Sequence, residues 1–345
     1  PVFSLPVLPP PQRICILRLS AIGDCCHTLA VVRRLQNHFP QAQLTWIIGK
    51  TEARLFGSLP NIEFIVFDKQ GGRPAWQALQ AQLKHRKWDV LLHMQAALRA
   101  SRIARHIRAP IKLGFDKARA KDYQWLFTNS RIAPETNAHV LDGLMGFADA
   151  LGAPPANVTD HRAWNMPVSI TEKLTHPTLL ISPCSSNRAR NFRNWSVDNY
   201  IAVARYALDT LGWRVILTGG NSPLEQDYGT QITAALPRVD NRIGKTSLPE
   251  LLALIAQARA VMCPDSGPAH MATMVGTPVI GLYATSNPDR TGPYLQRQYT
   301  VNAYPAAVQQ FLGQTVANVA WGKRVRNPEA MSLISVEAVL TQLNL

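Results

Sequence analysis

Residues 13–49, RICILRLSAIGDCCHTLAVVRRLQNHFPQAQLTWIIG, decide the fold because they form one complete strand–helix–strand pattern. Residues 13–20 and 44–49 are short runs rich in aliphatic side chains, typical of strands buried in a parallel sheet. Residues 27–39, between them, have the length and apolar spacing of an amphipathic helix. This order of elements predicts a right-handed crossover, in which the helix covers one face of a parallel sheet.

The same alternation continues through the chain. Further strands are predicted at 63–68, 89–94, 111–115, 178–184, 213–220, 239–244, 260–265 and 278–284. Further helices are predicted at 75–86, 97–107, 197–212, 224–236 and 248–258. Alternating strands and helices are typical of doubly wound α/β domains, and 345 residues are more than one hydrophobic core usually holds.

The alternation stops at residues 154–177, which are rich in proline and polar side chains and therefore predict an interdomain linker. We expect an N-terminal Rossmann-like domain at 1–165 and a C-terminal one at 166–330. The last helix, in 331–345, is long enough to pack back on the N-terminal domain.

The chain is strongly basic, with a formal net charge of +14. The charge is concentrated in residues 69–131, which hold 14 lysines and arginines against three acidic residues. Such a surface attracts polyanions, which include nucleic acid, an anionic membrane face and a phosphorylated substrate. A solvated basic face without a dedicated ligand is the alternative.

No run approaches the 18 to 20 or so apolar residues that cross a bilayer, and the first residues lack the basic region of a secretory leader. We therefore expect a soluble, cytoplasmic protein. The cysteines lie in or beside predicted strands without metal-type spacing: Cys15, Cys25, Cys26, Cys184 and Cys263. Buried reduced thiols are the expectation, and a redox pair at Cys25 and Cys26 is the alternative.

Ligands of doubly wound sheets bind outside the carboxyl ends of the strands, so the loops there are the candidate sites. The first, SAIGDCCH at 20–27, has neither the dinucleotide-binding glycine pattern nor a P-loop. Its Asp24 is either the cap of the next helix or a carboxylate that takes part in chemistry. In the second, PDSGPAH at 264–270, a glycine and a helix N-terminus favour an anion, although Asp265 or Ser266 could serve only as a cap.

The third loop, residues 182–200, places hydroxyl side chains before Arg188, Arg190 and Arg193, whose guanidinium groups could bind a diphosphate. A merely solvated loop is the alternative. The fourth, TGGNSPLEQD at 218–227, has Glu225 in the first turn of a helix, which is a weak signal because acidic residues are common there.

Four blocks together resemble the ADP-heptose:lipopolysaccharide heptosyltransferases, in particular the heptosyltransferase I type. They are RLSAIGDCCHTLAVVRRLQNHFPQAQLTWI, NWSVDNYIAVA, ILTGGNSPLEQ and PDSGPAHMATMVGTPVIGLYATSNPDRTGPY. The resemblance covers nearly the whole chain and implies the GT-B fold, two Rossmann-like domains facing a central cleft. The nucleotide-sugar would bind the C-terminal domain, and the lipid-linked acceptor the N-terminal one.

The resemblance also implies roles for individual residues. Asp24 matches the general base that takes the proton from the acceptor hydroxyl. Donor-binding positions are Ser185, Ser186, Arg193, Glu225, Thr246, Asp265, Ser266, Gly267 and His270. Acceptor-binding positions are Ser20, Gly23, Arg119 and Lys121. Arg193 stands where related enzymes often have lysine, which keeps the charge and changes a point contact to a planar fork.

The implied reaction is an inverting transfer of heptose from ADP-heptose to a Kdo residue of Kdo-lipid A, with no cofactor and no metal. The acceptor carries anionic groups at the cytoplasmic face of the inner membrane, and the basic surface suits peripheral attachment there. Transfer of a later inner-core heptose, a GT-B epimerase and a non-catalytic polyanion-binding protein remain alternatives. Nucleic acid is not expected as a partner, because the basic residues lack interleaved aromatic side chains.

Overall fold

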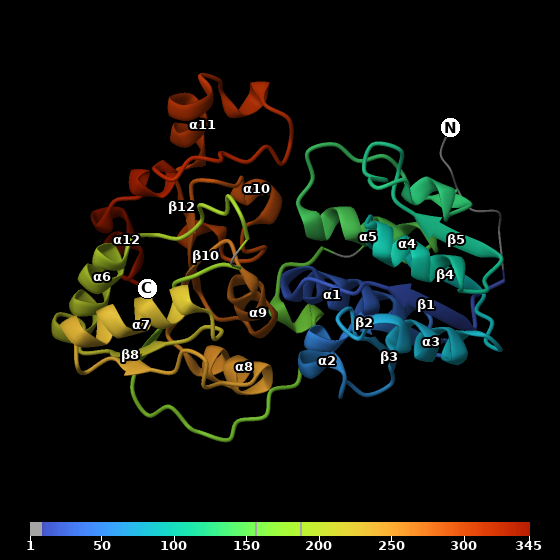
Figure 1. The fold of residues 1–345 in the computed structure, drawn as a ribbon, viewed down its shortest axis with the longest axis horizontal. Coiled ribbons are helices and arrows are strands. Elements are labelled where there is room, and N and C mark those ends of the chain that lie inside the picture. The colour runs from blue at the N-terminus through green and yellow to red at the C-terminus, as the bar shows by residue number, and fades with distance from the viewer. Residues whose placement is uncertain (1–8, 156, 187) are drawn as a thin grey trace. The chain divides into compact units, whose positions relative to one another are not determined.

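The computed structural model describes residues 9–155, 157–186 and 188–345, so the first eight residues, at which we looked for a leader, lie outside it. The chain divides into two compact units, Pro1–Val158 and Thr159–Leu345. Figure 1 shows the first in blue to green and the second in green to red. The division falls within the predicted linker at 154–177, although ahead of the expected boundary at 165/166.

The first unit is a six-stranded parallel sheet with the order β3-β2-β1-β4-β5-β6. Its strands are β1 (Arg13–Leu17), β2 (Gln43–Gly49), β3 (Glu63–Phe67), β4 (Val90–His93), β5 (Ile111–Gly114) and β6 (Ser130–Arg131). Its α-helices are α1 (Ile22–His38), α2 (Lys50–Phe56), α3 (Gly72–Leu83), α4 (Leu98–Arg105) and α5 (Val140–Ala150). Helices α1 and α5 pack against each other, and α3 and α4 pack on strands of the sheet.

The second unit is also a six-stranded parallel sheet, with the order β12-β11-β10-β7-β8-β9. Its strands are β7 (Thr178–Ile181), β8 (Arg214–Leu217), β9 (Asp240–Asn241), β10 (Ala260–Pro264), β11 (Val279–Tyr283) and β12 (Val301–Asn302). Its α-helices are α6 (Val197–Asp209), α7 (Pro223–Ala235), α8 (Leu248–Gln257), α9 (Gly267–Val275), α10 (Pro288–Thr291), α11 (Tyr304–Leu312) and α12 (Val336–Gln342). All ten strands predicted from the sequence are present, and β6 and β12 are additional edge strands of two residues each.

The two sheets share one topology, which places the candidate sites. In each, the first and fourth strands of the unit are neighbours and the winding reverses between them, at β1 and β4 in one unit and at β7 and β10 in the other. Loops that leave two such strands diverge to opposite faces of the sheet and open a crevice at their carboxyl ends. Each unit therefore has one switch point, at which we look for ligand-binding side chains.

The cores explain why the central strands form where they do. Residues 14–17 of β1 are fully buried, so both faces of this strand are covered, as a near-continuous apolar run predicts. All five cysteines are buried and none forms a disulfide, which confirms the expected reduced thiols and gives no redox pair at Cys25 and Cys26. Burial raises the pKa of the Cys263 thiol to about 12, which makes it inert as a nucleophile at neutral pH.

The C-terminal helix packs within the second unit. Helix α12 lies on α6 of the second unit, and Val339 and Leu343 join the core of that unit. The buried Trp195 donates its indole N–H to the carbonyl of Ile334, which fixes the approach to α12 from the same unit. The apolar face of α12 is therefore covered by the second core, and packing of residues 331–345 on the first domain stays a prediction.

Within the described part of the chain, no helix combines the length and the apolarity that crossing a bilayer requires.

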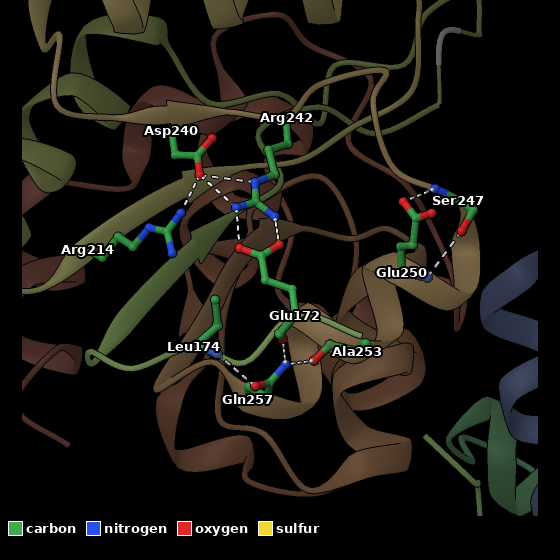
Figure 2. A network of polar contacts seen from close by, with 9 residues as sticks. All are labelled: Glu172, Leu174, Arg214, Asp240, Arg242, Ser247, Glu250, Ala253 and Gln257. Atoms are coloured by element: carbon green, nitrogen blue, oxygen red, sulfur yellow. Dashed lines mark hydrogen bonds and ion pairs between the residues drawn. The ribbon is translucent and has the colours of Figure 1, made fainter. Parts of the chain in front are cut away.

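A polar network fastens residues 172–174, within the predicted linker, to the second sheet (Figure 2). Both carboxylate oxygens of Glu172 accept hydrogen bonds from the Arg242 guanidinium. Asp240 pairs with the same guanidinium at 2.9 Å and with Arg214 at 2.6 Å. Gln257 adds two bonds to the linker backbone, one to the Glu172 carbonyl and one from the Leu174 N–H, each 2.9 Å long.

Replacing Arg242 by glutamine should lower the free energy of unfolding by on the order of 1 kcal/mol at neutral pH, since half-exposed ion pairs contribute little each. Hydrogen bonds from Arg242 lower the pKa of Glu172. Burial alone would raise the pKa of Asp240, but the hydrogen bonds from Arg242 and Arg214 outweigh it and lower that pKa. A carboxyl group whose pKa is lower in the folded than in the unfolded state stabilises the folded state at pH values above its unfolded-state pKa. The difference in the free energy of unfolding between variant and wild type should therefore shrink as the pH falls below about 4.

Urea unfolding at several pH values measures this difference. The matched control is Arg238→Gln, which breaks the isolated exposed pair of Arg238 with Asp209. A cost for Arg242→Gln no larger than the control, or one that does not depend on pH, would contradict the network's role.

Candidate active site

The first switch point brings Asp24 and Arg18 together. Asp24 lies in the first turn of α1, and its carboxylate pairs with the Arg18 guanidinium at 2.7 Å. The same guanidinium donates to the backbone carbonyls of Ser20, at 2.8 Å, and Met94, at 2.6 Å. Arg18 thus joins the ends of β1 and β4 and holds the carboxylate in one orientation, while the Asp24 side chain keeps 36% of its surface exposed.

Asp24 does not cap helix α1. The cap residue is Ala21, which has no side chain able to accept a hydrogen bond, and Asp24 comes three residues later. Its hydrogen bond with the Thr28 hydroxyl uses the backbone carbonyl of Asp24, so the carboxylate plays no part in that contact. Of the two interpretations of Asp24 that the sequence left open, the role as a helix cap is therefore excluded. An acidic side chain in the first turn still interacts favourably with the helix dipole.

Ser20 lies on a cavity of about 190 Å³ at this edge of the first sheet. Gln95, from the end of β4, donates to the Ser20 hydroxyl at 3.4 Å and accepts from the Leu19 N–H at 2.8 Å. Four cations line the cavity: Lys50, Arg54, Lys69 and Arg99. Glu52 and Asp68 also line it, and Asp68 pairs with Lys50 at 3.2 Å. An anionic ligand of sugar size would meet a net positive charge here.

The other three predicted acceptor residues have different surroundings. Gly23 lies in the first turn of α1, beside Asp24. Arg119 is largely engaged within its own unit, since its guanidinium pairs with Asp116 at 2.5 Å and donates to the Ala133 carbonyl at 3.2 Å. Lys121 is exposed, two residues away. Of the two predicted cations, Lys121 is therefore the one available to a ligand, and Arg119 holds its loop.

The second switch point centres on Asp265, which follows β10 and is 7% exposed. One oxygen of its carboxylate accepts from the Ser286 hydroxyl at 2.8 Å and from the Thr291 hydroxyl at 3.1 Å. Arg193 donates to the Asp265 backbone carbonyl at 3.1 Å, with a second nitrogen 3.7 Å from the same carboxylate oxygen. Asp265 thus connects the segments that follow β7, β10 and β11, and its carboxylate faces these partners.

The start of α9 suits an anion. Its cap residue Ser266 makes no side-chain bond to the first helical N–H groups, because its hydroxyl donates to the Pro264 carbonyl at 3.1 Å. Gly267 opens the helix with no side chain, and both residues are half-buried. His270, one turn in, is buried at 7% exposure and belongs to the packed side of the helix. Pro268 has no N–H, and the Ala269 N–H donates to the Ser266 carbonyl at 3.2 Å, so the backbone N–H of Gly267, rather than the imidazole, is the donor left at this end of the helix.

The loop after β7 contains the two predicted hydroxyls and three arginines. Ser185 is buried, and its hydroxyl accepts from the Asn191 amide at 2.8 Å. Ser186, Arg188 and Arg190 are exposed, whereas only 14% of the Arg193 side chain is exposed. The structure therefore separates Arg193, held against Asp265, from the two arginines at the surface of this loop.

Glu225 forms a capping box at the start of α7. Its carboxylate accepts from the Gly220 N–H at 2.8 Å, the Ser222 N–H at 3.1 Å and the Ser222 hydroxyl at 2.7 Å. A carboxylate offers about four acceptor sites, so one remains for a ligand hydroxyl. Thr246 lies half-buried in the loop before α8, where Ser247 and Glu250 form a second capping box.

Replacing Glu225 by alanine should lower the free energy of unfolding by about 1 kcal/mol, because the box at α7 is lost. If the remaining acceptor site binds a ribose hydroxyl, the Kd for ADP should also rise about tenfold. The control is Glu250→Ala, which removes the same box at α8 and should leave ADP affinity unchanged. Urea unfolding and calorimetric titration with ADP measure the two effects, and equal ADP affinity in both variants would restrict Glu225 to capping.

Several residues of these sites escaped the sequence analysis. Arg18 lies within the predicted strand 13–20 as an interruption of an apolar run, although a cation six residues before a conspicuous carboxylate was a usable signal. Lys50 and Lys69 each follow a predicted strand directly, which also could have been noticed. Ser286, in the loop after β11, and Thr291, at the end of α10, contact Asp265, and no local pattern reveals such contacts. Among the residues that the structure describes, no three His, Cys, Asp or Glu side chains converge as metal ligands would.

Known proteins similar to this chain agree with this architecture. Residues 76–316 match the family model "Glycosyltransferase family 9 (heptosyltransferase)". The chain is 40% identical to the lipopolysaccharide core heptosyltransferase OpsX of Haemophilus influenzae, over 96% of each chain. It is 22% identical to lipopolysaccharide heptosyltransferase 1 of Pseudomonas aeruginosa, over 86% of this chain and 85% of the relative.

Among solved structures, E. coli heptosyltransferase WaaC with ADP superposes with a TM-score of 0.75 at 17% identity, over 96% of this chain and 98% of the other. E. coli ADP-heptose lps heptosyltransferase II has a TM-score of 0.70 at 18% identity, over 96% and 97%. These likenesses confirm the GT-B fold that the sequence predicted. Together with the family match, they establish that the chain belongs to glycosyltransferase family 9, the heptosyltransferases.

Proposed function

We propose that this protein transfers L-glycero-D-manno-heptose from ADP-heptose to a Kdo residue of Kdo-lipid A, in the assembly of the lipopolysaccharide inner core. Relatives named for lipopolysaccharide core heptosyltransfer support the pathway, and those named heptosyltransferase 1 support the type. Solved relatives were determined with ADP and with ADP-2-deoxy-2-fluoro heptose, which supports the donor. The observation that carries the proposal is the Asp24 carboxylate, oriented by Arg18 at the first switch point.

Asp24 acts as the general base. Its partly exposed carboxylate takes the proton from a Kdo hydroxyl as that oxygen attacks the anomeric carbon of the heptose. The new glycosidic bond forms while the bond from the anomeric carbon to the β-phosphate oxygen breaks, and ADP leaves with the electron pair. Attack from the face opposite the leaving group inverts the anomeric centre. One carboxylate suffices for this reaction, because no covalent intermediate has to be formed and released.

The acceptor binds the first unit. The cavity beside Ser20 offers Lys50, Lys69 and Arg99 to the carboxylates and phosphates of the acceptor, and Lys121 adds an exposed cation. Gly23 leaves the approach to Asp24 free of a side chain, and Arg119 keeps its loop in position through Asp116. Glu52 lines the same cavity, and burial raises the pKa of its carboxyl.

The donor binds the second unit. The backbone N–H groups of Ser266 and Gly267, at the start of α9, contact the diphosphate together with Arg193. Ser185, Ser186 and Thr246 line the path of the nucleotide, Glu225 offers its free acceptor site to the ribose, and His270 and Asp265 fix the turn from within. Cations and amides then stabilise the leaving ADP, so that the reaction needs neither a metal nor another cofactor.

The working place of the protein is the cytoplasmic face of the inner membrane, where its lipid acceptor lies. The basic segment from Lys69 to Arg131 supports peripheral attachment to an anionic surface.

Incubation with ADP-heptose and Kdo-lipid A, followed by mass analysis of the product, tests the proposal. A mass increase of one heptose on Kdo-lipid A, with release of ADP, is the expected result. Addition only to acceptors that already carry heptose would assign the protein to a later inner-core step. Conversion of the nucleotide-sugar without an acceptor would indicate an epimerase, and no change in either substrate would overturn the proposal.

A further inference from the structure

Three large apolar side chains stand exposed together in the connection between β5 and β6. Tyr123, Trp125 and Leu126 expose 67%, 49% and 61% of their surfaces. They lie within four consecutive residues, and the fourth residue, Gln124, is fully buried. Soluble proteins rarely expose aromatic and aliphatic side chains side by side, and a cluster of this kind indicates an interaction surface.

Gln124 anchors the loop beneath these side chains. Its amide nitrogen donates to the His93 carbonyl at 2.8 Å, and its amide oxygen accepts from the Phe115 N–H at 3.0 Å. Asp122 and Tyr123 adopt left-handed backbone conformations, with φ of 52° and 58°, just before the short helical turn at Gln124–Leu126. The backbone is thus held in a shape that turns one polar residue inward and its apolar neighbours outward.

The surface around the exposed cluster is basic. Leu126 lines a shallow hollow with Arg105 and Lys112, and Arg105 also lines the neighbouring hollow with Lys84 and Arg108. Lys117 and Lys121 precede the cluster in the same loop and are exposed. The exposed apolar cluster is therefore next to several lysine and arginine side chains.

We propose that Tyr123, Trp125 and Leu126 insert into the headgroup region of an anionic lipid bilayer, with the surrounding cations on the lipid phosphates. Tyrosine and tryptophan favour the membrane–water interface because each combines an apolar ring with a polar tip. Cations close to an anionic leaflet add attraction that salt weakens. The lipid surface fits better than a second copy of this chain, because a symmetric pairing through this face would bring the cations of one copy, among them Arg105, Arg108 and Lys121, close to the cations of the other.

The inference rests on the proposed function in one respect, since an enzyme acting on a lipid-linked acceptor gains from holding its acceptor-binding unit at the bilayer. Beyond the proposed function, the inference identifies the loop between β5 and β6 as the segment that contacts the bilayer. None of the three inserted residues belongs to the proposed acceptor cavity or to the base, so membrane binding and transfer can be measured separately.

The test is sedimentation of the full chain with vesicles of phosphatidylcholine alone or mixed with phosphatidylglycerol. We expect binding to the mixed vesicles and little binding to phosphatidylcholine. The triple variant Tyr123→Ser/Trp125→Ser/Leu126→Ser should bind the mixed vesicles at least about tenfold more weakly. Arg105→Gln with Arg108→Gln should weaken binding by about fivefold for each cation and reduce its salt dependence.

Matched controls remove similar groups elsewhere. Ile170 is 55% exposed in the second unit, so Ile170→Ser should leave vesicle binding unchanged, as should Arg205→Gln. Trp125→Phe should still bind, whereas quenching of tryptophan fluorescence by brominated lipids should fall relative to wild type. This variant keeps the loop intact and distinguishes insertion from unfolding.

Transfer to a short, lipid-free acceptor keeps the two proposals apart. The triple variant should retain this transfer and lose only vesicle binding, whereas absence of transfer in the wild type would concern the proposed function alone. Wild-type binding to vesicles that survives the triple substitution would overturn the inference. So would a dimer in sedimentation velocity that the triple substitution dissociates while vesicle binding persists, because the cluster would then join two copies.

Discussion

The variant Asp24→Asn should transfer heptose about 10² to 10⁴ times more slowly than the wild type, the usual contribution of a general base. Asparagine has nearly the shape of aspartate and cannot accept the proton of the attacking hydroxyl. Because Ala21 rather than Asp24 is the cap of α1, the substitution removes no helix-capping bond. The free energy of unfolding should therefore stay within about 1 kcal/mol of wild type, the loss of the ion pair with Arg18 being the main change.

Single-turnover kinetics with saturating ADP-heptose measure the chemical step, and calorimetric titration with ADP should give a wild-type Kd. Asp122→Asn is the matched control, since this exposed aspartate lies in the same unit and asparagine tolerates its left-handed backbone. Near wild-type turnover in Asp24→Asn would exclude Asp24 as the base. A loss of folding instead would return the residue to a structural role.

The fold was predictable from the sequence because its signals are local. Most of the ten predicted strands are apolar runs that the structure buries, as in β1, β4, β7 and β10. The missed strands β6 and β12 have two residues each at the edges of their sheets, and no apolar run marks them. The edge strand β9 is equally short, but it lies within the predicted strand at 239–244.

The sites were predictable only in part, because their details depend on contacts between distant residues. The position of Asp24 beside a switch point follows from the pattern of strands and loops. Its pairing with Arg18 depends on how two strand ends meet, and the inward-facing carboxylate of Asp265 depends on hydroxyls 21 and 26 residues further along the chain. Trp125 is a further case, since a large apolar residue is expected in the core and only the fold shows that it is exposed.

The second large effect is expected at Arg193, where Arg193→Met should raise the Kd for ADP by on the order of 100-fold, the loss expected for charge-assisted hydrogen bonds to a phosphate. Arg193 is mostly buried and uses one nitrogen on the Asp265 backbone carbonyl. The Asp265 carboxylate already accepts hydrogen bonds from the Ser286 and Thr291 hydroxyls, so it does not occupy all N–H donors of the Arg193 guanidinium. Since a guanidinium carries five N–H donors, several remain for the diphosphate.

Arg193→Lys separates the charge from the shape of the guanidinium. Lysine keeps the positive charge, but one ammonium cannot hold the Asp265 backbone and bind two phosphate oxygens in the same plane, so we expect an intermediate rise in the Kd of about tenfold. Arg190→Met removes an exposed arginine from the same loop and should change the Kd by less than about threefold, because exposed charges are strongly screened. Equal effects of Arg190→Met and Arg193→Met would mean that the loop attracts ADP only through its overall charge. Urea unfolding completes the comparison, because a merely structural Arg193 would lower stability in the methionine variant while the folded protein kept its affinity for ADP.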